Sequence, residues 1–120
     1  DVDTVLEFSS TGGRGSGLKG SGKRAKTESV RCMTIDSVAN GADVDIIKYD
    51  VEGDERRALL GSAETIARCR PSLIVSLYHR TEDIFALPLM INRMLPSAKF
   101  YMSRIPCIPA WDLTLFAISG

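Results

Sequence analysis

The sequence predicts an α/β domain whose sheet is mostly parallel and ends in an antiparallel hairpin. From residue 45 onward, strand-like and helix-like stretches follow in the order strand, helix, strand, helix, strand, strand, which is typical of strands connected through helices. The nearly continuous apolar run of Ile46, Ile47, Tyr49 and Val51 is expected of a parallel strand covered on both faces. Pro106 and Pro109 in the last connection favour a wide hairpin over a helical crossover. This order corresponds to the second half of a doubly wound sheet, with no first half in front of it.

The N-terminal part contains two strand candidates separated by a polar segment. Residues 5–8 (V-L-E-F) form the first candidate. Residues 9–29 are rich in Gly, Ser, Thr and Lys without hydrophobic periodicity, so they predict a long mobile loop. Residues 30–35 alternate well enough for another strand, and Asp36 is expected to cap a brief helical turn before Asn40.

The remaining elements are two helices and three further strands. The first helix is predicted over residues 54–70, with Asp54 as its cap. Residues 72–78 (S-L-I-V-S-L-Y) form a second buried strand. Thr81 is expected to cap the second helix, in which Pro88 marks either a kink or the start of its main part. The last strands are predicted at residues 99–103 and 113–118. The apolar positions of the two helices are Leu59, Leu60, Ala63, Ile66 and Ala67, and Ile84, Leu87, Ile91 and Met94.

Composition excludes several classes of protein. With 120 residues and 44% hydrophobic content, the chain fits one globular domain. Its formal net charge is zero, which argues against wholesale capture of nucleic acid or an anionic membrane. Six basic residues and a single acidic one lie between residues 14 and 31, so a basic loop is expected on a slightly acidic body. That loop has no aromatic residue to stack a base, so a solvated loop is favoured over a nucleic-acid site.

Cysteine usage and hydropathy indicate a cytoplasmic protein. The three cysteines, Cys32, Cys69 and Cys107, are an odd number without C-x-x-C spacing, so neither a disulfide framework nor a zinc site is predicted. No apolar run approaches the roughly 20 residues that span a bilayer, and no signal peptide is visible. The chain begins at Asp1, which suggests a processed product or a piece of something longer.

The glycine-rich loop matches two phosphate-binding patterns, and both fail. Residues 15–20 fit G-x-G-x-x-G, and residues 17–23 resemble G-x-x-x-x-G-K. Both patterns need a helix N-terminus next to the phosphates, and residues 21–29 have no apolar face that would bury such a helix. Arg24 also stands where a Ser or Thr must bind magnesium.

The candidate active site lies at the ends of two neighbouring strands. Asp50 and Glu52 follow the strand at 45–50, and Gly53 permits a sharp turn there. His79, the single histidine, directly follows the next strand. Because ligands of open α/β sheets bind at the carboxyl ends of the strands, His79 and Asp50 are expected to converge on one cleft. An imidazole beside a carboxylate is a candidate general base. Capping acids and a loop histidine are the structural alternatives, and no metal site is predicted.

These residues lie within a longer stretch that resembles a known family. The run I-K-Y-D-V-E-G-D-E at residues 47–55, with Leu60-Gly61 and Arg70-Pro71, is similar to the pattern of FkbM-type methyltransferases. The resemblance extends from the T-I-D segment at 34–36 to the W-D-L-T-L-F-A-I segment at 111–118. It implies a Rossmann-like methyltransferase fold and divides the chain at residue 30. Residues 1–29 would be a short strand with a Gly/Ser/Lys-rich loop, and residues 30–120 a partial methyltransferase domain.

The resemblance also implies a reaction. FkbM-type enzymes transfer a methyl group from S-adenosylmethionine to a hydroxyl, often of a sugar or natural product, so a small-molecule or carbohydrate acceptor is expected. Asp50 or His79 would accept the hydroxyl proton, and Glu52 would position the loop or the acceptor. The glycine-rich turn that binds the cofactor in the family is not found in this sequence, so cofactor binding by the chain alone is in question. The alternative is a non-catalytic interaction module. In either case the exposed edge of the strand at 45–50 invites homodimerisation.

Overall fold

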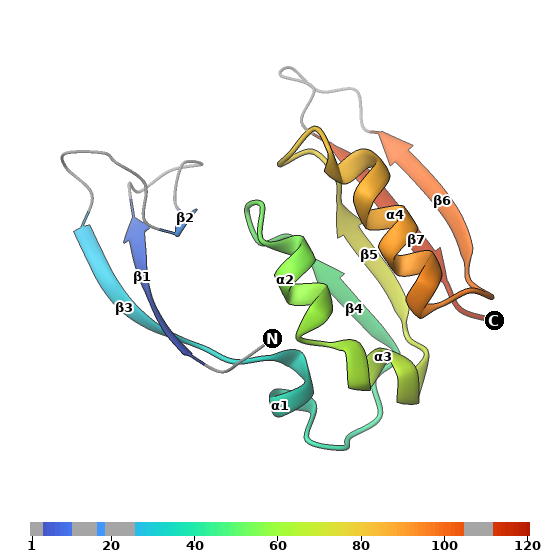
Figure 1. The fold of residues 1–120 in the computed structure, drawn as a ribbon, viewed down its shortest axis with the longest axis horizontal. Coiled ribbons are helices and arrows are strands. Elements are labelled where there is room, and N and C mark those ends of the chain that lie inside the picture. The colour runs from blue at the N-terminus through green and yellow to red at the C-terminus, as the bar shows by residue number, and fades with distance from the viewer. Residues whose placement is uncertain (1–3, 11–16, 19–25, 105–111) are drawn as a thin grey trace.

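The computed structural model describes residues 4–10, 17–18, 26–104 and 112–120, and the side chains of these ranges from residue 31 onward. The described strands form two sheets, a three-stranded one in the order β2-β1-β3 and a four-stranded one in the order β4-β5-β7-β6. Figure 1 shows the three-stranded sheet to one side of the four-stranded sheet and its helices. The chain passes from one part to the other between β3 and α1.

The three-stranded sheet occupies part of the segment that was expected to be a loop. Strand β1 (Thr4–Ser10) pairs antiparallel with β3 (Lys26–Cys32) along its whole length, and with the two-residue β2 (Gly17–Leu18). The loop prediction is therefore wrong for residues 9–10, 17–18 and 26–29. Backbone pairing with β1 stabilises β3, and the amino-acid composition of a segment does not reveal such pairing. Most of the two rejected glycine-rich motifs lies outside the described residues.

The four-stranded sheet confirms the predicted mixture of directions. Strand β4 (Ile46–Tyr49) runs parallel to β5 (Ser72–Ser76). Strand β7 (Leu113–Ile118) lies between β5 and β6 (Lys99–Arg104) and is antiparallel to both. Thus β4, β5 and β6 point the same way, and β7 alone is reversed. The connection with Pro106 and Pro109 lies outside the described residues.

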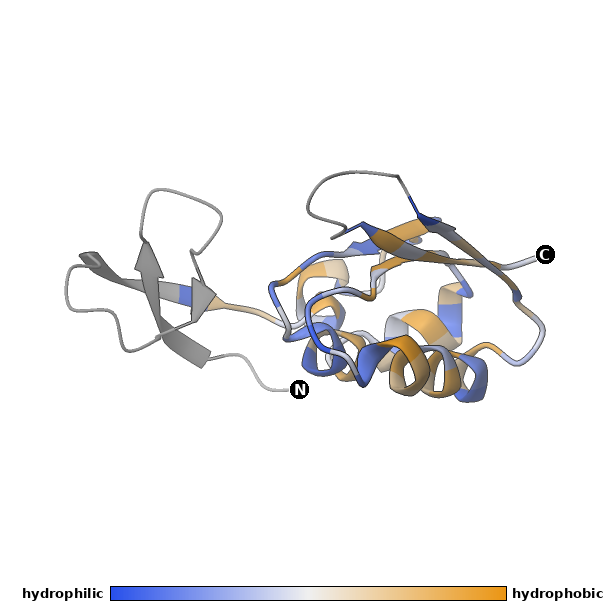
Figure 2. Cartoon of the chain, turned by 90° about the horizontal axis from the view of Figure 1, so that it is seen from above, coloured by the Kyte–Doolittle hydropathy of each residue, from blue (hydrophilic) through white to orange (hydrophobic). Residues whose placement is uncertain are grey.

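Helices cover one face of this sheet, and the core lies beneath them. Buried side chains alternate along β4, β5 and β7 and fall in register across these strands, as in the row Tyr49, Val75, Leu115. Helix α4 passes in front of β5 and β7 (Figure 1), and Figure 2 shows the helices on one side of the sheet. On the other face of β4, Ile46 is 63% exposed. The expectation that this strand is covered on both faces is therefore wrong for the part of the chain that the structure describes.

The predicted helix over residues 54–70 is two short helices, α2 (Glu55–Leu60) and α3 (Ala63–Cys69). The break falls at Gly61 and Ser62. The Ser62 hydroxyl donates to carbonyls of the preceding turn and lies 2.6 Å from the hydroxyl of buried Tyr49, which ties the break to β4. Burial, and to a smaller extent the negative charge of Asp36, raise the pKa of Tyr49 to about 12, although the hydrogen bond with Ser62 acts to lower it. Of the predicted apolar face, Leu59 and Ile66 are buried, while Leu60, Ala63 and Ala67 are exposed.

The N-cap residue differs from the prediction at two helices, α1 and α4. Thr34, rather than Asp36, caps α1 (Ile35–Ala39), and Asp36 lies in the first turn. Glu82, rather than Thr81, is the N-cap of α4 (Asp83–Met94). Asp54 occupies the predicted cap position of α2 but makes no side-chain cap hydrogen bond. Helix α4 continues through Pro88, and its predicted apolar positions are buried or half-buried.

Candidate active site

Two parallel strands bring the candidate residues to one edge of the sheet. Asp50 directly follows β4, and Tyr78 and His79 follow β5 after one further residue. The two strands pair in register from Ile46↔Ser72 to Tyr49↔Val75, so their carboxyl ends lie side by side. The Ser76 hydroxyl donates a 3.0 Å hydrogen bond to Asp50 and ties the two ends together.

The turn after β4 has an unusual backbone that presents Glu52. Glu52 has a φ of 54° and Gly53 a φ of +99°, so two successive residues lie in the region that L-residues rarely adopt. A Cβ at Gly53 would lie 3.2 Å from the Arg80 Nε. Non-glycine residues in this region cost free energy and gather at functional sites. The turn sends the chain directly into α2, and glycine at 53 leaves room for Arg80.

His79 lies close to both of the other predicted residues, Asp50 and Glu52. Its side chain is only 9% exposed. Its Nε2 atom lies 3.7 Å from Asp50 Oδ1 and 3.6 Å from Glu52 Oε2. Within the described ranges, Nε2 is buried without a hydrogen-bond partner. The structure thus brings Asp50, Glu52 and His79 together.

Glu55 is the residue of this cluster that reasoning from spacing missed. It is fully buried at the first position of α2, and its Oε1 lies 2.7 Å from His79 Nδ1. The same oxygen accepts a hydrogen bond from Val51 N at 3.0 Å, while Oε2 is buried without a partner among the described groups. A carboxylate in the first helical turn after D-x-E-G was the available signal. A carboxylate at this position is equally well explained by its favourable interaction with the helix N-terminus.

Asp50 is held in its ionised form. Burial raises its pKa, but hydrogen bonds from Ser76, Lys48 and Tyr78 more than offset this, and the pKa lies below its ordinary value. The Tyr78 hydroxyl donates to Oδ1 at 3.1 Å, and Lys48 Nζ lies 3.2 Å from Oδ2. Burial and the negative charge of Asp50 raise the pKa of Tyr78 in turn. Asp50 is therefore a hydrogen-bond acceptor at neutral pH.

A further acid, Asp83, lies behind the cluster at the start of α4. Only 6% of the residue is exposed. Burial, and then the charges of Glu55 and Glu82, raise its pKa above the ordinary value, against the smaller effects of Arg80 and His79. The interior beside His79 is therefore strongly acidic.

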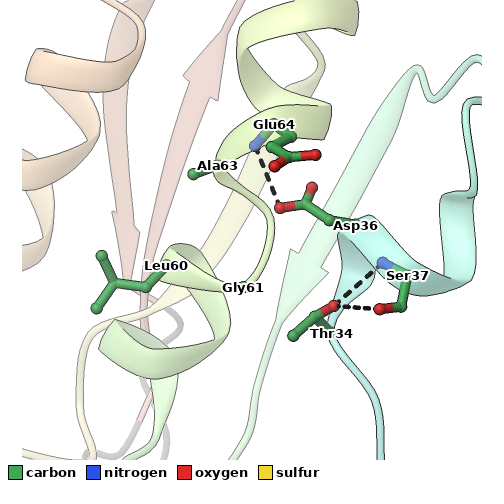
Figure 3. A pocket seen from close by; sticks show the side chains of 7 residues that line it. All are labelled: Thr34, Asp36, Ser37, Leu60, Gly61, Ala63 and Glu64. Atoms are coloured by element: carbon green, nitrogen blue, oxygen red, sulfur yellow. Dashed lines mark hydrogen bonds between the residues drawn. The ribbon is translucent and has the colours of Figure 1, made fainter. Parts of the chain in front are cut away.

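A separate hollow of about 430 Å³ lies between α1 and the α2–α3 break. Figure 3 shows its lining residues and the hydrogen bonds among them. The Asp36 carboxylate accepts hydrogen bonds from Glu64 N at 3.2 Å and Thr65 N at 2.7 Å and thereby caps α3. These bonds lower the pKa of Asp36, although burial, the largest single cause, acts to raise it. The Thr34 hydroxyl and the Asp36 carboxylate are engaged in capping, so we assign this hollow no chemistry. The lining residues are Thr34, Asp36, Ser37, Leu60, Gly61, Ala63 and Glu64.

The described residues define no metal or membrane site. In these ranges, His, Cys, Asp and Glu form no group of three or more that would hold a metal ion. No helix among them is long and apolar enough to cross a bilayer. They also contain no glycine-rich turn between a strand and a helix that would hold a nucleoside, so we assign no residue contact to a methyl-donor cofactor.

Comparison with known proteins identifies the family. The model of the methyltransferase FkbM domain matches residues 3–102, so the chain belongs to this family. Among solved structures, the chain is similar to the methyltransferase FkbM from Methylobacillus flagellatus KT, with 29% sequence identity and a TM-score of 0.65. The similarity covers 75% of this chain and 24% of that chain. A comparison with curated proteins found no match. The family match ends at residue 102, so the resemblance over 111–118 stays a prediction.

Proposed function

We propose that this chain forms the acceptor side of an S-adenosylmethionine-dependent methyltransferase that methylates a hydroxyl of a sugar or natural product. Membership of the FkbM family supports a methyltransferase. The observation that carries the proposal is the His79 Nε2 atom, which is buried, lacks a partner in the described ranges and lies within 4 Å of two carboxylates. An acceptor hydroxyl that reaches Nε2 would find an acceptor for its proton.

The roles follow from the hydrogen bonds that each residue already makes. Asp50 Oδ1 already accepts hydrogen bonds from Ser76 and Tyr78. Asp50 is therefore better suited to bind the acceptor than to remove the proton of the acceptor hydroxyl. His79 Nε2 is uncommitted, and we assign it as the general base. Glu52 is 56% exposed, and its Oε2 lies 3.6 Å from His79 Nε2, where it would position the acceptor. In-line displacement requires chiefly that the two reactants be held close and aligned.

The cofactor enters this proposal only as the source of the methyl group. S-adenosylmethionine would supply an activated methyl on its sulfonium. The residues described here supply the acceptor side, and we derive no contact to the nucleoside. We also propose that the protein works in the cytoplasm and that its exposed β4 edge allows homodimerisation.

Substitutions in the full-length protein test the roles. Asp50→Asn and His79→Ala should each lower kcat/KM, His79→Ala by roughly 10²–10⁴-fold because that is the usual contribution of a general base. Asp45→Asn, an exposed acid at the other end of β4, is the matched control and should leave turnover unchanged. Methyl transfer is measured with radiolabelled S-adenosylmethionine and a panel of hydroxylated acceptors. Unchanged turnover in both site variants would refute the roles.

A second interpretation is a non-catalytic module that keeps the sheet. The similarity covers 24% of the M. flagellatus protein, so family membership alone does not establish turnover. Calorimetric titration of the purified chain with S-adenosylmethionine and its demethylated product tests whether the chain itself binds the cofactor. Binding supports the enzyme. A folded chain that binds neither ligand is either a half-domain whose chemistry depends on a separate cofactor-binding part or the module, and turnover of the full-length protein separates these two.

A further inference from the structure

We infer that Glu55 is a positioning residue that fixes the proton of the neutral His79 ring on Nδ1 and directs the Nε2 lone pair toward Asp50 and Glu52. The inference rests on the proposed role of His79 as general base. The inference assigns a role to Glu55, which has none in the proposed function.

The contacts of Glu55 set its orientation. Oε1 accepts a hydrogen bond from Val51 N at 3.0 Å, and this amide belongs to the turn that carries Glu52. The carboxylate is therefore anchored to the same loop that forms the site. With full burial and the first position of α2 fixing its backbone, the side chain has little freedom to turn away.

The geometry between Glu55 and His79 determines which ring nitrogen holds the proton. An ionised carboxylate only accepts hydrogen bonds, so at 2.7 Å from Oε1 the Nδ1 atom must donate. In the neutral imidazole the other nitrogen then carries a lone pair. That nitrogen is Nε2, the buried atom near Asp50 and Glu52. A neutral imidazole with its proton on Nε2 would instead place a donor there and could not accept a proton from a hydroxyl.

The proton inventory of the proposed step balances through these groups. The acceptor hydroxyl loses its proton to Nε2 as its oxygen forms a bond to the methyl carbon, and the bond from that carbon to sulfur breaks with its electron pair on sulfur. The ring becomes a cation that donates from both nitrogens. Its Nδ1–H remains on Glu55, whose negative charge stabilises the cation at short range.

A spectroscopic test uses the fact that His79 is the single histidine of the 120 residues. Nitrogen-15 labelling of the ring and long-range proton–nitrogen correlation NMR report directly which nitrogen is protonated. In the unsubstituted chain, the neutral ring should carry its proton on Nδ1. In Glu55→Ala, the population should move toward the Nε2–H form. Glu55→Gln keeps an acceptor oxygen and should retain Nδ1–H, so it provides the readout if the alanine variant fails to fold. A proton on Nε2 in the unsubstituted chain overturns the inference.

Kinetics in the full-length protein separate positioning from a general structural role. Glu55→Ala should lower kcat/KM by about 10–100-fold, the range typical of residues that orient a functional histidine. In a His79→Ala background the same change should have almost no further effect, because coupled residues are non-additive. Glu64→Gln, which removes an exposed acid, is the control for charge. An equal loss from Glu55→Ala in both backgrounds overturns the inference, whereas full activity of His79→Ala refutes the proposed base itself.

Discussion

The pKa values of two acids near His79, the buried Asp83 and the partly exposed Asp50, are shifted in opposite directions, and this decides how each contributes to stability. Burial and neighbouring acids raise the pKa of Asp83. Burial also acts to raise the pKa of Asp50, but three donated hydrogen bonds reverse the effect and lower it. The difference between the two residues is one of partners, since only Asp50 is surrounded by donors. Stability measured against pH should therefore distinguish them.

Asp83→Asn is expected to stabilise the chain at neutral pH. A carboxyl whose pKa is raised on folding makes a contribution that is fully present below its ordinary value of 3.8 and is lost as pH rises through the folded-state pKa. Asparagine has no charge to bury. The free energy of unfolding of the variant should therefore exceed that of the unsubstituted chain above about pH 4, and the difference should be complete at pH 7. Urea unfolding at several pH values measures it. A variant less stable than the unsubstituted chain at pH 7 would contradict the prediction.

Asp50→Asn is the matched control for this experiment. Because the pKa of Asp50 is lowered on folding, its contribution is present above the ordinary value and is lost as pH falls through the folded-state pKa. The asparagine variant should be less stable than the unsubstituted chain at pH 7, and the difference should shrink in acid. At pH 7, Asp83→Asn should therefore raise the free energy of unfolding and Asp50→Asn should lower it.

Residue-scale prediction from the sequence succeeds where the position along a strand decides the outcome. Asp50 and His79 each follow a strand, and parallel strands align their carboxyl ends, so their proximity could be predicted. Glu55 could not be found in this way because it is on a helix. Its contact with His79 depends on the turn at Glu52 and Gly53, whose backbone angles no spacing reveals.

At the scale of elements, the β4–α2 turn is the connection on which the site depends. Gly53→Ala places a Cβ at a φ of +99° and 3.2 Å from Arg80 Nε. It should lower the free energy of unfolding by about 1–2 kcal/mol, the usual cost of a left-handed conformation, and should also reduce methyl transfer because Glu52 and Glu55 flank the turn. Thermal or urea unfolding and an activity assay measure the two effects.

Gly41→Ala provides the comparison for this prediction. Gly41 also has a positive φ, of +86°, but a Cβ there would meet nothing within 4 Å. It should cost backbone strain alone and leave activity unchanged. If Gly53→Ala were no more harmful than Gly41→Ala in either assay, the contact with Arg80 and the importance of the turn would be disproved.

The elements that sequence reasoning misjudged are those decided by partners distant in sequence. The break between α2 and α3 depends on the hydrogen bond between Ser62 and Tyr49, which are 13 residues apart. The cap of α3 comes from Asp36, 28 residues before Glu64. Helical periodicity over 54–70 does not encode either contact. In contrast, β7 was predicted within its observed bounds because its alternation is local.

At the scale of the whole molecule, the order β4-β5-β7-β6 leaves β4 at an edge of the described sheet. The parallel pair and the final hairpin were predictable from connection lengths and prolines. The insertion of β7 between β5 and β6 was not, since chain order alone permits either strand of a hairpin to join β5. The uncovered face was also unexpected, because apolar residues on β4 favoured burial on both sides while Ile46 is 63% exposed.

The exposed β4 edge leads to a prediction about association. An edge strand presents unpaired backbone groups that recruit another strand, and charged side chains prevent this. We expect the purified chain to self-associate as its concentration rises, and Ile46→Lys to weaken that association by at least several-fold. Sedimentation velocity over a range of concentrations measures it. Val38→Lys charges a comparably exposed apolar residue that lies on α1 and not on β4, and should leave association unchanged. Concentration-independent monomers, or equal effects of both substitutions, would exclude the β4 edge as the point of contact.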